Sequence, residues 1–298
     1  MKRITSHANP LFRDWFKLAT SARDRREQGL TLIDGVRLLD TYLRHHRTPQ
    51  DVLVAESAAG RREISALLRR LQVSPVILAD RLFDELTELS TPSGILAVIE
   101  IPRTRDQGAG GCWLLLEDIQ DPGNLGSILR TAVAAGVSDA WLSKGCADAW
   151  SPRVLRGAMG AHFALCIHER SNLVNVALRR SGSVIALEVD GPSSLYHLDL
   201  RGAIAFALGN EGSGLSSALR EVATEHAAIP MQGDAESLNV AAAAAVCLFE
   251  RFRQLGPKHL GAAAPSLGQI PNDGRKTLPI RHDPRKNPDS IRPKPSTS

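Results

Sequence analysis

Asn124 and Arg130, near the middle of the chain, follow an apolar run and a glycine-containing turn, a context in which their side chains could bind a ligand. The run at residues 114–116 predicts a buried strand, and the Ala-rich segment after the turn predicts a helix that ends at Gly136. The first N–H groups of a helix lack backbone partners, so such a turn favours a ligand site. Asn124 can cap this helix or bind a ligand. Arg130 shares a helix face with Gly126, whose missing side chain leaves the guanidinium group room to meet a substrate.

On its own, this stretch fits a capped helix of purely structural role equally well. Two later segments favour the interpretation as a ligand site. The first, residues 208–215, has the sequence LGNEGSGL and follows an apolar run. The second comprises Ile229-Pro230-Met231 and, a few residues later, Ser237-Leu238-Asn239. Glycines in such loops let backbone N–H and C=O groups approach a bound molecule closely.

Taken together, the three blocks resemble, in order and rough spacing, the three motifs of the SpoU (TrmH) family of RNA ribose 2'-O-methyltransferases. The resemblance extends from Trp113 to Gln254, about half of the chain. It implies an enzyme that uses S-adenosylmethionine to methylate a ribose hydroxyl group of RNA, that works as a homodimer, and that carries a deep trefoil knot. Knots are very rare in proteins, so only the resemblance supports this last expectation.

The resemblance also implies which residues form the site. Backbone groups and apolar walls of the second and third motifs are expected to bind the cofactor, with Leu208, Gly209, Asn210, Gly212, Ile229, Pro230, Met231, Ser237 and Leu238 as the predicted residues. The polar positions of the three motifs are Asn124, Glu211 and Asn239, which are expected to order the loops or the substrate. Glu211 can also orient Arg130. Asn239 fits a simple helix cap as well.

Arg130 is the residue expected to contribute most to catalysis. A role as general base is unfavourable because a guanidinium group stays protonated in proteins. A guanidinium clamp on the phosphate, which also stabilises developing charge on the ribose oxygen, requires no proton loss. Both roles stay open at this point, as does a surface salt bridge with Asp121 or Glu211.

Other cofactors and metals have less support in the sequence. Gly209, Gly212 and Gly214 give the pattern GxxGxG, the wrong order for a dinucleotide fingerprint, and no GxxxxGK[ST] phosphate loop is present. The nine histidines show no spacing typical of metal ligands, so no metal site is predicted.

The composition predicts a two-domain cytoplasmic protein with no membrane partner. The chain has 298 residues, of which 43% are hydrophobic. Its N-terminus lacks the apolar core of a signal peptide, and no apolar run reaches the length of a membrane span. Its four cysteines lie far apart and form no CxxC pair, which favours a reducing compartment.

Residues 1–103 are expected to form a small α/β domain that binds RNA. Apolar periodicity predicts one helix from about residue 10 to 27, followed by alternating strands and helices up to residue 101. The segments at residues 4–10 and 33–39 resemble the substrate-binding domain attached to many SpoU proteins. The candidate phosphate contacts of this domain are Arg23, Arg25, Arg26 and Arg37.

The remainder of the chain divides into a linker, a second domain and a tail. The polar, Gly-rich residues 104–111 predict a flexible linker. Residues 112–255 are the expected methyltransferase domain, in which short apolar runs separated by helices predict a mainly parallel sheet covered on both faces. The Pro-rich residues 256–298 predict a disordered basic tail. Net charge is +3 over residues 1–103, −4 over residues 104–255 and +5 over the tail, and basic flanks suit RNA, although solvated surface charge explains any single cluster as well.

The sequence thus predicts an α/β, S-adenosylmethionine-dependent RNA ribose 2'-O-methyltransferase of SpoU type. Ribosomal RNA is favoured over transfer RNA as substrate, because the simplest family members that act on transfer RNA lack an N-terminal domain. Two alternatives stay open. One is a noncatalytic RNA-binding protein that retains the fold, and the other is a knotted methyltransferase acting on a base nitrogen, against which Asn124 and Arg130 in the first motif argue.

Overall fold

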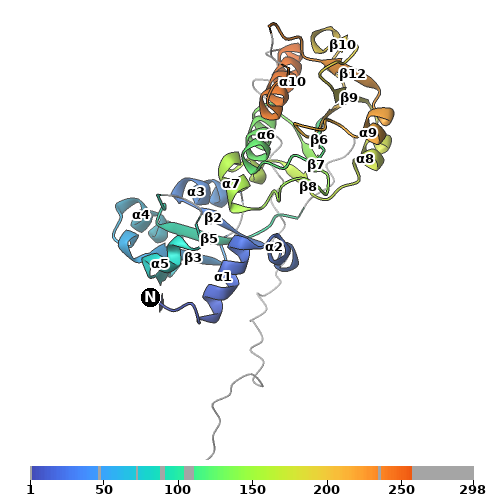
Figure 1. The fold of residues 1–298 in the computed structure, drawn as a ribbon. Coiled ribbons are helices and arrows are strands. Elements are labelled where there is room, and N and C mark those ends of the chain that lie inside the picture. The colour runs from blue at the N-terminus through green and yellow to red at the C-terminus, as the bar shows by residue number, and fades with distance from the viewer. Residues whose placement is uncertain are drawn as a thin grey trace, which may run out of the picture. The chain divides into compact units, whose positions relative to one another are not determined.

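The computed structural model describes residues 2–45, 48–71, 73–87, 91–103, 111–233 and 236–256. The predicted linker, apart from Gly111, and the predicted basic tail, apart from Gly256, lie outside these residues. Two sheets, each with its own set of helices, organise the described part of the chain (Figure 1). No helix within that part is long and apolar enough to cross a membrane.

The N-terminal sheet has five strands in the order β1-β4-β3-β5-β2. β4 runs parallel to β1 and β3, whereas β5 runs antiparallel to β3 and β2, so the sheet is mixed. Its strands are β1 (Lys2–Ile4), β2 (Leu30–Asp34), β3 (Asp51–Ala55), β4 (Val76–Leu78) and β5 (Ile95–Glu100). Its helices are α1 (Pro10–Thr20), α2 (Ala22–Gln28), α3 (Val36–His45), the short 3-10 helix Glu56–Ala58, α4 (Arg62–Leu71) and α5 (Asp80–Asp84).

The first predicted helix is in fact two helices. The Asn9 side chain accepts a hydrogen bond from the backbone N–H of Leu11 at 3.0 Å, so α1 begins where the sequence indicates. The chain then breaks at Ser21, whose backbone is extended (φ −119°, ψ 111°). The hydroxyl group of Ser21 accepts a hydrogen bond from the backbone N–H of Asp24 at 3.2 Å and caps α2. A polar residue that can cap a new helix therefore interrupts an otherwise continuous helical pattern.

The C-terminal sheet has seven strands in the order β10-β12-β9-β11-β6-β7-β8, and every neighbouring pair is parallel. This confirms the predicted parallel α/β architecture. The strands are β6 (Cys112–Leu116), β7 (Asp139–Leu142), β8 (Cys166–His168), β9 (Ser183–Leu187), β10 (Ser193–Ser194), β11 (Ile204–Leu208) and β12 (Glu225–Ala228). The helices are α6 (Pro122–Ala134), α7 (Pro152–Ala158), α8 (Leu173–Arg179), α9 (Ser217–Val222) and α10 (Val240–Leu255), with 3-10 helices at Ala161–Phe163 and Leu195–His197.

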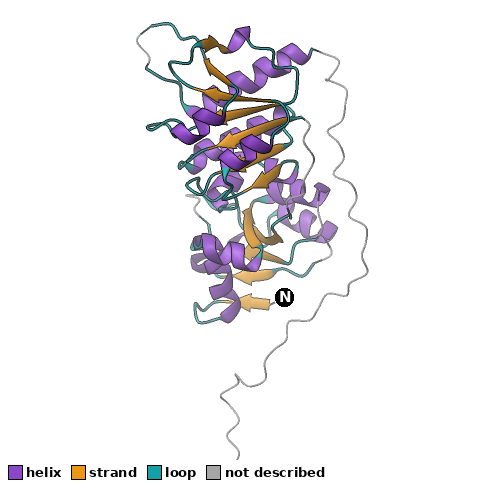
Figure 2. Ribbon diagram, turned by 90° about the vertical axis from the view of Figure 1, so that its right-hand side faces the viewer, coloured by secondary structure: helices purple, strands orange, loops and turns teal. Residues whose placement is uncertain are grey.

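Helices cover both faces of this parallel sheet. Leu114 and Leu116 of β6 belong to the apolar cluster that includes residues of α6, α7 and α10, whereas Trp113 and Leu115 pack in the cluster with α8 and α9. Figure 1 shows α6 and α10 on one side of these strands and α8 and α9 on the other, and Figure 2 shows the strands as an inner layer. Burial of both faces explains why the strands appear in the sequence as continuous apolar runs.

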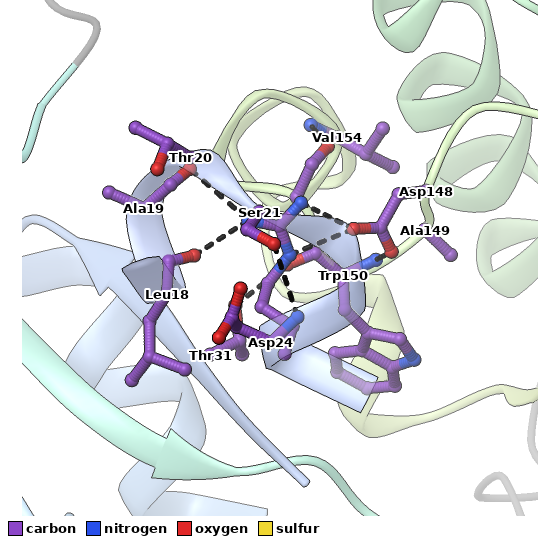
Figure 3. A network of polar contacts seen from close by, with 12 residues as sticks. Leu18, Ala19, Thr20, Ser21, Asp24, Thr31, Asp148, Ala149, Trp150 and Val154 are labelled. Carbon is purple, nitrogen blue, oxygen red and sulfur yellow. Dashed lines mark hydrogen bonds and ion pairs between the residues drawn. The ribbon is translucent and has the colours of Figure 1, made fainter. Parts of the chain in front are cut away.

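Side chains of α2 and β2 contact the segment that leads into α7 (Figure 3). Arg25 is only 4% exposed, and its Nε donates to Asp148 Oδ2 at 2.8 Å while its Nη1 donates to the backbone carbonyl of Leu18 at 2.6 Å. Thr31 Oγ1 donates to the backbone carbonyl of Trp150 at 2.7 Å. The expectation that Arg25 contacts RNA phosphate is therefore corrected, because its guanidinium group is buried and bonded within the protein.

Replacing Arg25 with Met is expected to lower the free energy of unfolding by about 3–5 kcal/mol, because it leaves the largely buried Asp148 carboxylate without its cation. Urea unfolding followed by circular dichroism measures this change. The matched control is Arg23→Met on the same helix, which breaks only the solvent-exposed pair with Glu27 and should leave the unfolding midpoint unchanged. Equal midpoints for the two variants would show that the buried ion pair contributes nothing to stability.

Candidate functional site

The loops that follow four parallel strands meet at one edge of the C-terminal sheet. Because all seven strands run in the same direction, their carboxyl ends lie together, which is where α/β proteins bind ligands. The residues directly after β6, β9, β11 and β12 are therefore neighbours in space. Each of the three sequence motifs follows a different one of these strands.

A cavity of about 400 Å³ lies at this edge. Eight of the nine predicted cofactor-binding residues line it, namely Leu208, Gly209, Asn210, Gly212, Ile229, Met231, Ser237 and Leu238. The ninth, Pro230, is exposed and does not line the cavity. Two motifs that are well separated along the chain thus form one concave surface.

The loop after β11 is a tight turn that requires glycine. A Cβ atom at Gly209 would lie 2.2 Å from the carbonyl carbon of Gly214, so no other residue fits without a backbone shift. Backbone hydrogen bonds of 3.1 and 2.9 Å between Asn210 and Gly214 close the turn. Asn210 Oδ1 accepts from the N–H of Gly212 at 2.9 Å, and its Nδ2 donates to the carbonyl of Asp118 at 3.0 Å. The Asn210 side chain thereby ties the second motif to the loop after β6.

The three polar motif residues Asn124, Glu211 and Asn239 contact one another. Asn239 Nδ2 donates to Asn124 Oδ1 at 3.0 Å and to Glu211 Oε1 at 3.3 Å. Asn124 Nδ2 also donates to the same Glu211 oxygen. In addition, Asn239 Oδ1 caps α10 by accepting from the N–H groups of Ala241 and Ala242, so its capping and bridging roles coexist. This polar trio joins the first turns of α6 and α10 to the loop after β11.

Arg130 lies exposed on α6, two turns after Asn124. In the described ranges of the chain it forms no hydrogen bond or ion pair, so neither of the salt bridges left open by the sequence is present. The expected orienting contact from Glu211 is also absent among those residues, since Glu211 instead accepts from Asn124 and Asn239. The guanidinium group of Arg130 is therefore available to a ligand.

Gly126 does not provide space for Arg130, which corrects that expectation. Gly126 is buried where α6 meets α7, and a Cβ atom there would lie 2.9 Å from Gly157 Cα and 2.9 Å from the carbonyl oxygen of Val154. Facing glycines allow the two helix backbones to approach this closely. Close packing of α6 against α7 thus explains the glycine at position 126.

Leu187 at the end of β9 and the three residues that follow it, Glu188, Val189 and Asp190, lie outside the sequence motifs and also line the cavity. Glu188 accepts from Arg220 Nε at 2.5 Å and lies 3.3 Å from His226 Nδ1. Burial raises the pKa of Glu188, but the hydrogen bonds with Arg220 and His226 outweigh it and hold the pKa below its usual value. The sequence signal that could have selected Glu188 is its position directly after β9, a parallel strand next to β11.

The other predicted residues lie away from this cavity. Arg23, Arg26 and Arg37 are exposed on α2 and α3, and Arg23 pairs with Glu27 at 2.6 Å. No cluster of three or more histidine, cysteine or acidic side chains that could hold a metal ion occurs among the residues described.

Family comparisons match both parts of the chain. Residues 111–249 match the SpoU rRNA Methylase family, and residues 9–97 match the MRM3-like substrate binding domain. The 23S rRNA (guanosine(2553)-2'-O)-methyltransferase RlmP of Bacillus subtilis is 33% identical over 251 residues, which cover 84% of this chain and 98% of that protein.

Two solved structures with a bound cofactor are also similar. The SpoU methyltransferase AviRb from Streptomyces viridochromogenes, in complex with the cofactor AdoMet, aligns with a TM-score of 0.74 and 27% identity, covering 83% of this chain and 98% of that one. The AdoMet-bound rRNA methyltransferase from Sinorhizobium meliloti aligns with a TM-score of 0.73 and 26% identity, covering 85% and 98%.

Replacing Gly126 with Ala is expected to destabilise the protein by about 1–3 kcal/mol, because the added methyl group forces the α6 and α7 backbones apart. Thermal unfolding measures the loss. The control is Gly60→Ala, where an added Cβ meets no atom within 4 Å. A Gly126→Ala protein as stable as this control would contradict the close helix packing.

Proposed function

The chain belongs to the SpoU rRNA methylase family, and on that premise we propose that it transfers a methyl group from S-adenosylmethionine to a ribose 2'-hydroxyl group of ribosomal RNA. The observation that carries this proposal is the cavity at the carboxyl edge of the sheet, whose lining includes Glu211 of the polar trio. A relative that matches over nearly its whole length is a 23S rRNA 2'-O-methyltransferase. The location of the protein in the cytoplasm stays a prediction.

The cavity suits S-adenosylmethionine in size and in lining. Pockets for ligands of this class typically enclose about 300–1,000 Å³, and this one encloses about 400 Å³. Leu208, Ile229 and Leu238 offer apolar walls for the adenine ring, while the turn from residue 209 to 214 offers backbone N–H and C=O groups for its edges. When bound, the cofactor supplies an electrophilic methyl group.

The polar trio gives the site a fixed shape. Asn124, Glu211 and Asn239 come from three segments and satisfy one another's side chains, so the loop beside the cavity is held to the starts of α6 and α10. We assign these residues to the catalytic site as groups that order this loop and the incoming ribose. Their role is positional, since hydrogen bonds of this kind keep reacting groups in register.

Arg130 acts as a guanidinium clamp in this proposal. Its free side chain can bind the phosphate next to the target ribose through paired hydrogen bonds and stabilise the negative charge that grows on the ribose oxygen. A general-base role is not proposed, because a guanidinium group stays protonated in proteins. The clamp requires only that Arg130 be unpaired in the free protein, as it is within the described residues.

We also propose that the protein is a homodimer that packs through α10. Phe249 on α10 is 47% exposed, and Ala242, Ala245 and Phe252 follow the three- and four-residue spacing that places them on the same helix face. Such an apolar stripe is typical of helix–helix contacts. α10 also packs against α6, the helix that carries Arg130.

The knot and the domain limits are further parts of the proposal. β12 lies near one end of the sheet, and the chain returns from it to α10, which packs against α6 and against β11 in the middle of the sheet. This return supports the trefoil knot expected from the resemblance. The division into residues 1–103 and 112–255 is supported by the separate five- and seven-stranded sheets. The exposed Arg23, Arg26 and Arg37 remain the proposed RNA contacts of the first domain.

Replacing Arg130 with Ala is expected to lower kcat about 10²- to 10³-fold, because the transition state loses a charged hydrogen-bond donor. Labelled S-adenosylmethionine is incubated with unmodified 23S rRNA transcript, and alkaline hydrolysis then tests for a resistant dinucleotide. Arg179→Ala, an exposed substitution at the end of α8, is the control and should retain full activity. Wild-type protein that places the label in hydrolysable nucleotides would point to base methylation, and no transfer at all would favour a noncatalytic RNA-binding protein.

Replacing Phe249 with Glu is expected to convert the dimer to a monomer, because a charged side chain would be buried in the apolar contact. Size-exclusion chromatography with light scattering measures the mass. Leu178→Glu, at a position 67% exposed on α8, is the control and should leave the dimer intact. A Phe249→Glu protein that stays dimeric would exclude this face as the interface.

A further inference from the structure

A second cavity, of about 160 Å³, lies at the same carboxyl edge of the C-terminal sheet. Three segments line it: α2, the loop that follows β7, and the residues that follow β8. Ala22 and Arg26 come from α2, while Leu142 ends β7 and residues 143–148, except for Gly145, come from the loop after it. Glu169 and Arg170 come from the third segment. Both parts of the chain, with their separate sheets, therefore contribute to one small cavity.

Three cationic residues are among those that line this cavity. Arg26, Lys144 and Arg170 are each exposed, and each comes from a different segment. Across the ranges that the structure describes, none of the three forms a hydrogen bond or an ion pair. Like charges repel one another, so gathering three of them around one cavity is unfavourable unless an anion binds there.

The two carboxyl groups that line the cavity also have other partners in the protein, although the charge of Arg26 acts on Glu169. Asp148 is already paired with the buried guanidinium group of Arg25. Glu169 Oε1 accepts from the backbone N–H of Ala149 at 3.0 Å. Burial and the neighbouring Asp148 raise the pKa of Glu169 to about 7, against the backbone N–H of Ala149 and the charge of Arg26, so this group binds its proton more tightly than an exposed glutamate does. The cavity can therefore accept an anion without strong repulsion.

Hydrogen bonds connect this cavity to the proposed cofactor site. Asn210, in the turn beside the cofactor cavity, donates to the backbone carbonyl of Asp118 at 3.0 Å. The carboxylate of Asp118 accepts from Ser143 Oγ at 2.5 Å, and Ser143 lines the second cavity. The two cavities thus share one framework of loops along the edge of the sheet.

We propose that Arg26, Lys144 and Arg170 form a subsite for a backbone phosphate of the same RNA strand whose ribose is methylated. This inference rests on the proposed function, and it names how the substrate is positioned. Phosphate contacts fix the register of an RNA on a protein without reading its sequence. Because Arg26 belongs to the N-terminal part and the other two cations to the C-terminal part, the subsite holds RNA to both. These three are positioning residues and touch no reacting atom.

The test compares the double variant Lys144→Gln/Arg170→Gln and the single variant Arg26→Gln with wild-type protein. Filter binding of unmodified 23S rRNA transcript is measured from 50 to 200 mM salt, and methyl transfer is measured in parallel. Each lost cation should weaken binding about two- to fivefold, and loss of the phosphate contact in the double variant should lower the slope of log K against log salt by about 0.7–0.9. KM for RNA should rise by the same factor, while kcat and S-adenosylmethionine affinity stay within about twofold of wild type.

The matched control is Arg179→Gln, which removes an exposed charge from the end of α8, near the amino end of β9 and hence at the opposite edge of the sheet. It should leave the affinity and the salt slope unchanged. If the double variant behaves like this control, the phosphate subsite is wrong. Wild-type protein that binds RNA but methylates no ribose would overturn the proposed function alone, because affinity and slope would still decide the subsite.

Discussion

Seven strands that all run in one direction place every loop that follows a strand at the same edge of the sheet. The cofactor cavity, the polar trio and the second cavity all depend on this constraint, since each combines loops that are distant along the chain. Parallel strands need long connections, and here helices on both faces of the sheet supply most of them. A reversal of a single central strand would carry its loop to the opposite edge and dismantle the site.

Close packing then fixes where the loops can go. Gly126 and Gly157 let α6 and α7 approach backbone to backbone, which sets the position of the helix that presents both Asn124 and Arg130. Arg25 of α2 forms an ion pair with Asp148, which lies just before the start of α7. One chain of packed elements therefore runs from the N-terminal part to the proposed catalytic arginine.

Local sequence features predicted most of the elements. Continuous apolar runs indicated β6 and β11, because strands buried on both faces need apolar side chains at every position. Capping residues such as Asn9 located helix starts. The break at Ser21 was missed because a residue that can cap a helix is also tolerated inside one, and only packing selects between the two. The two-residue strand β10 was too short to leave a pattern.

The sequence by itself determined the family, the residue types at the edge of the sheet, and nine candidate cofactor-binding residues, of which eight line the cavity. These follow from short segments in which composition and spacing carry the information. Only the tertiary structure decided that Glu211 meets Asn124 and Asn239, that Gly126 serves helix packing, that Arg25 is buried, and that Arg26 lies with Lys144 and Arg170. Each of these is a contact between segments far apart in the chain, and the partner of a side chain is set by how the whole fold brings such segments together.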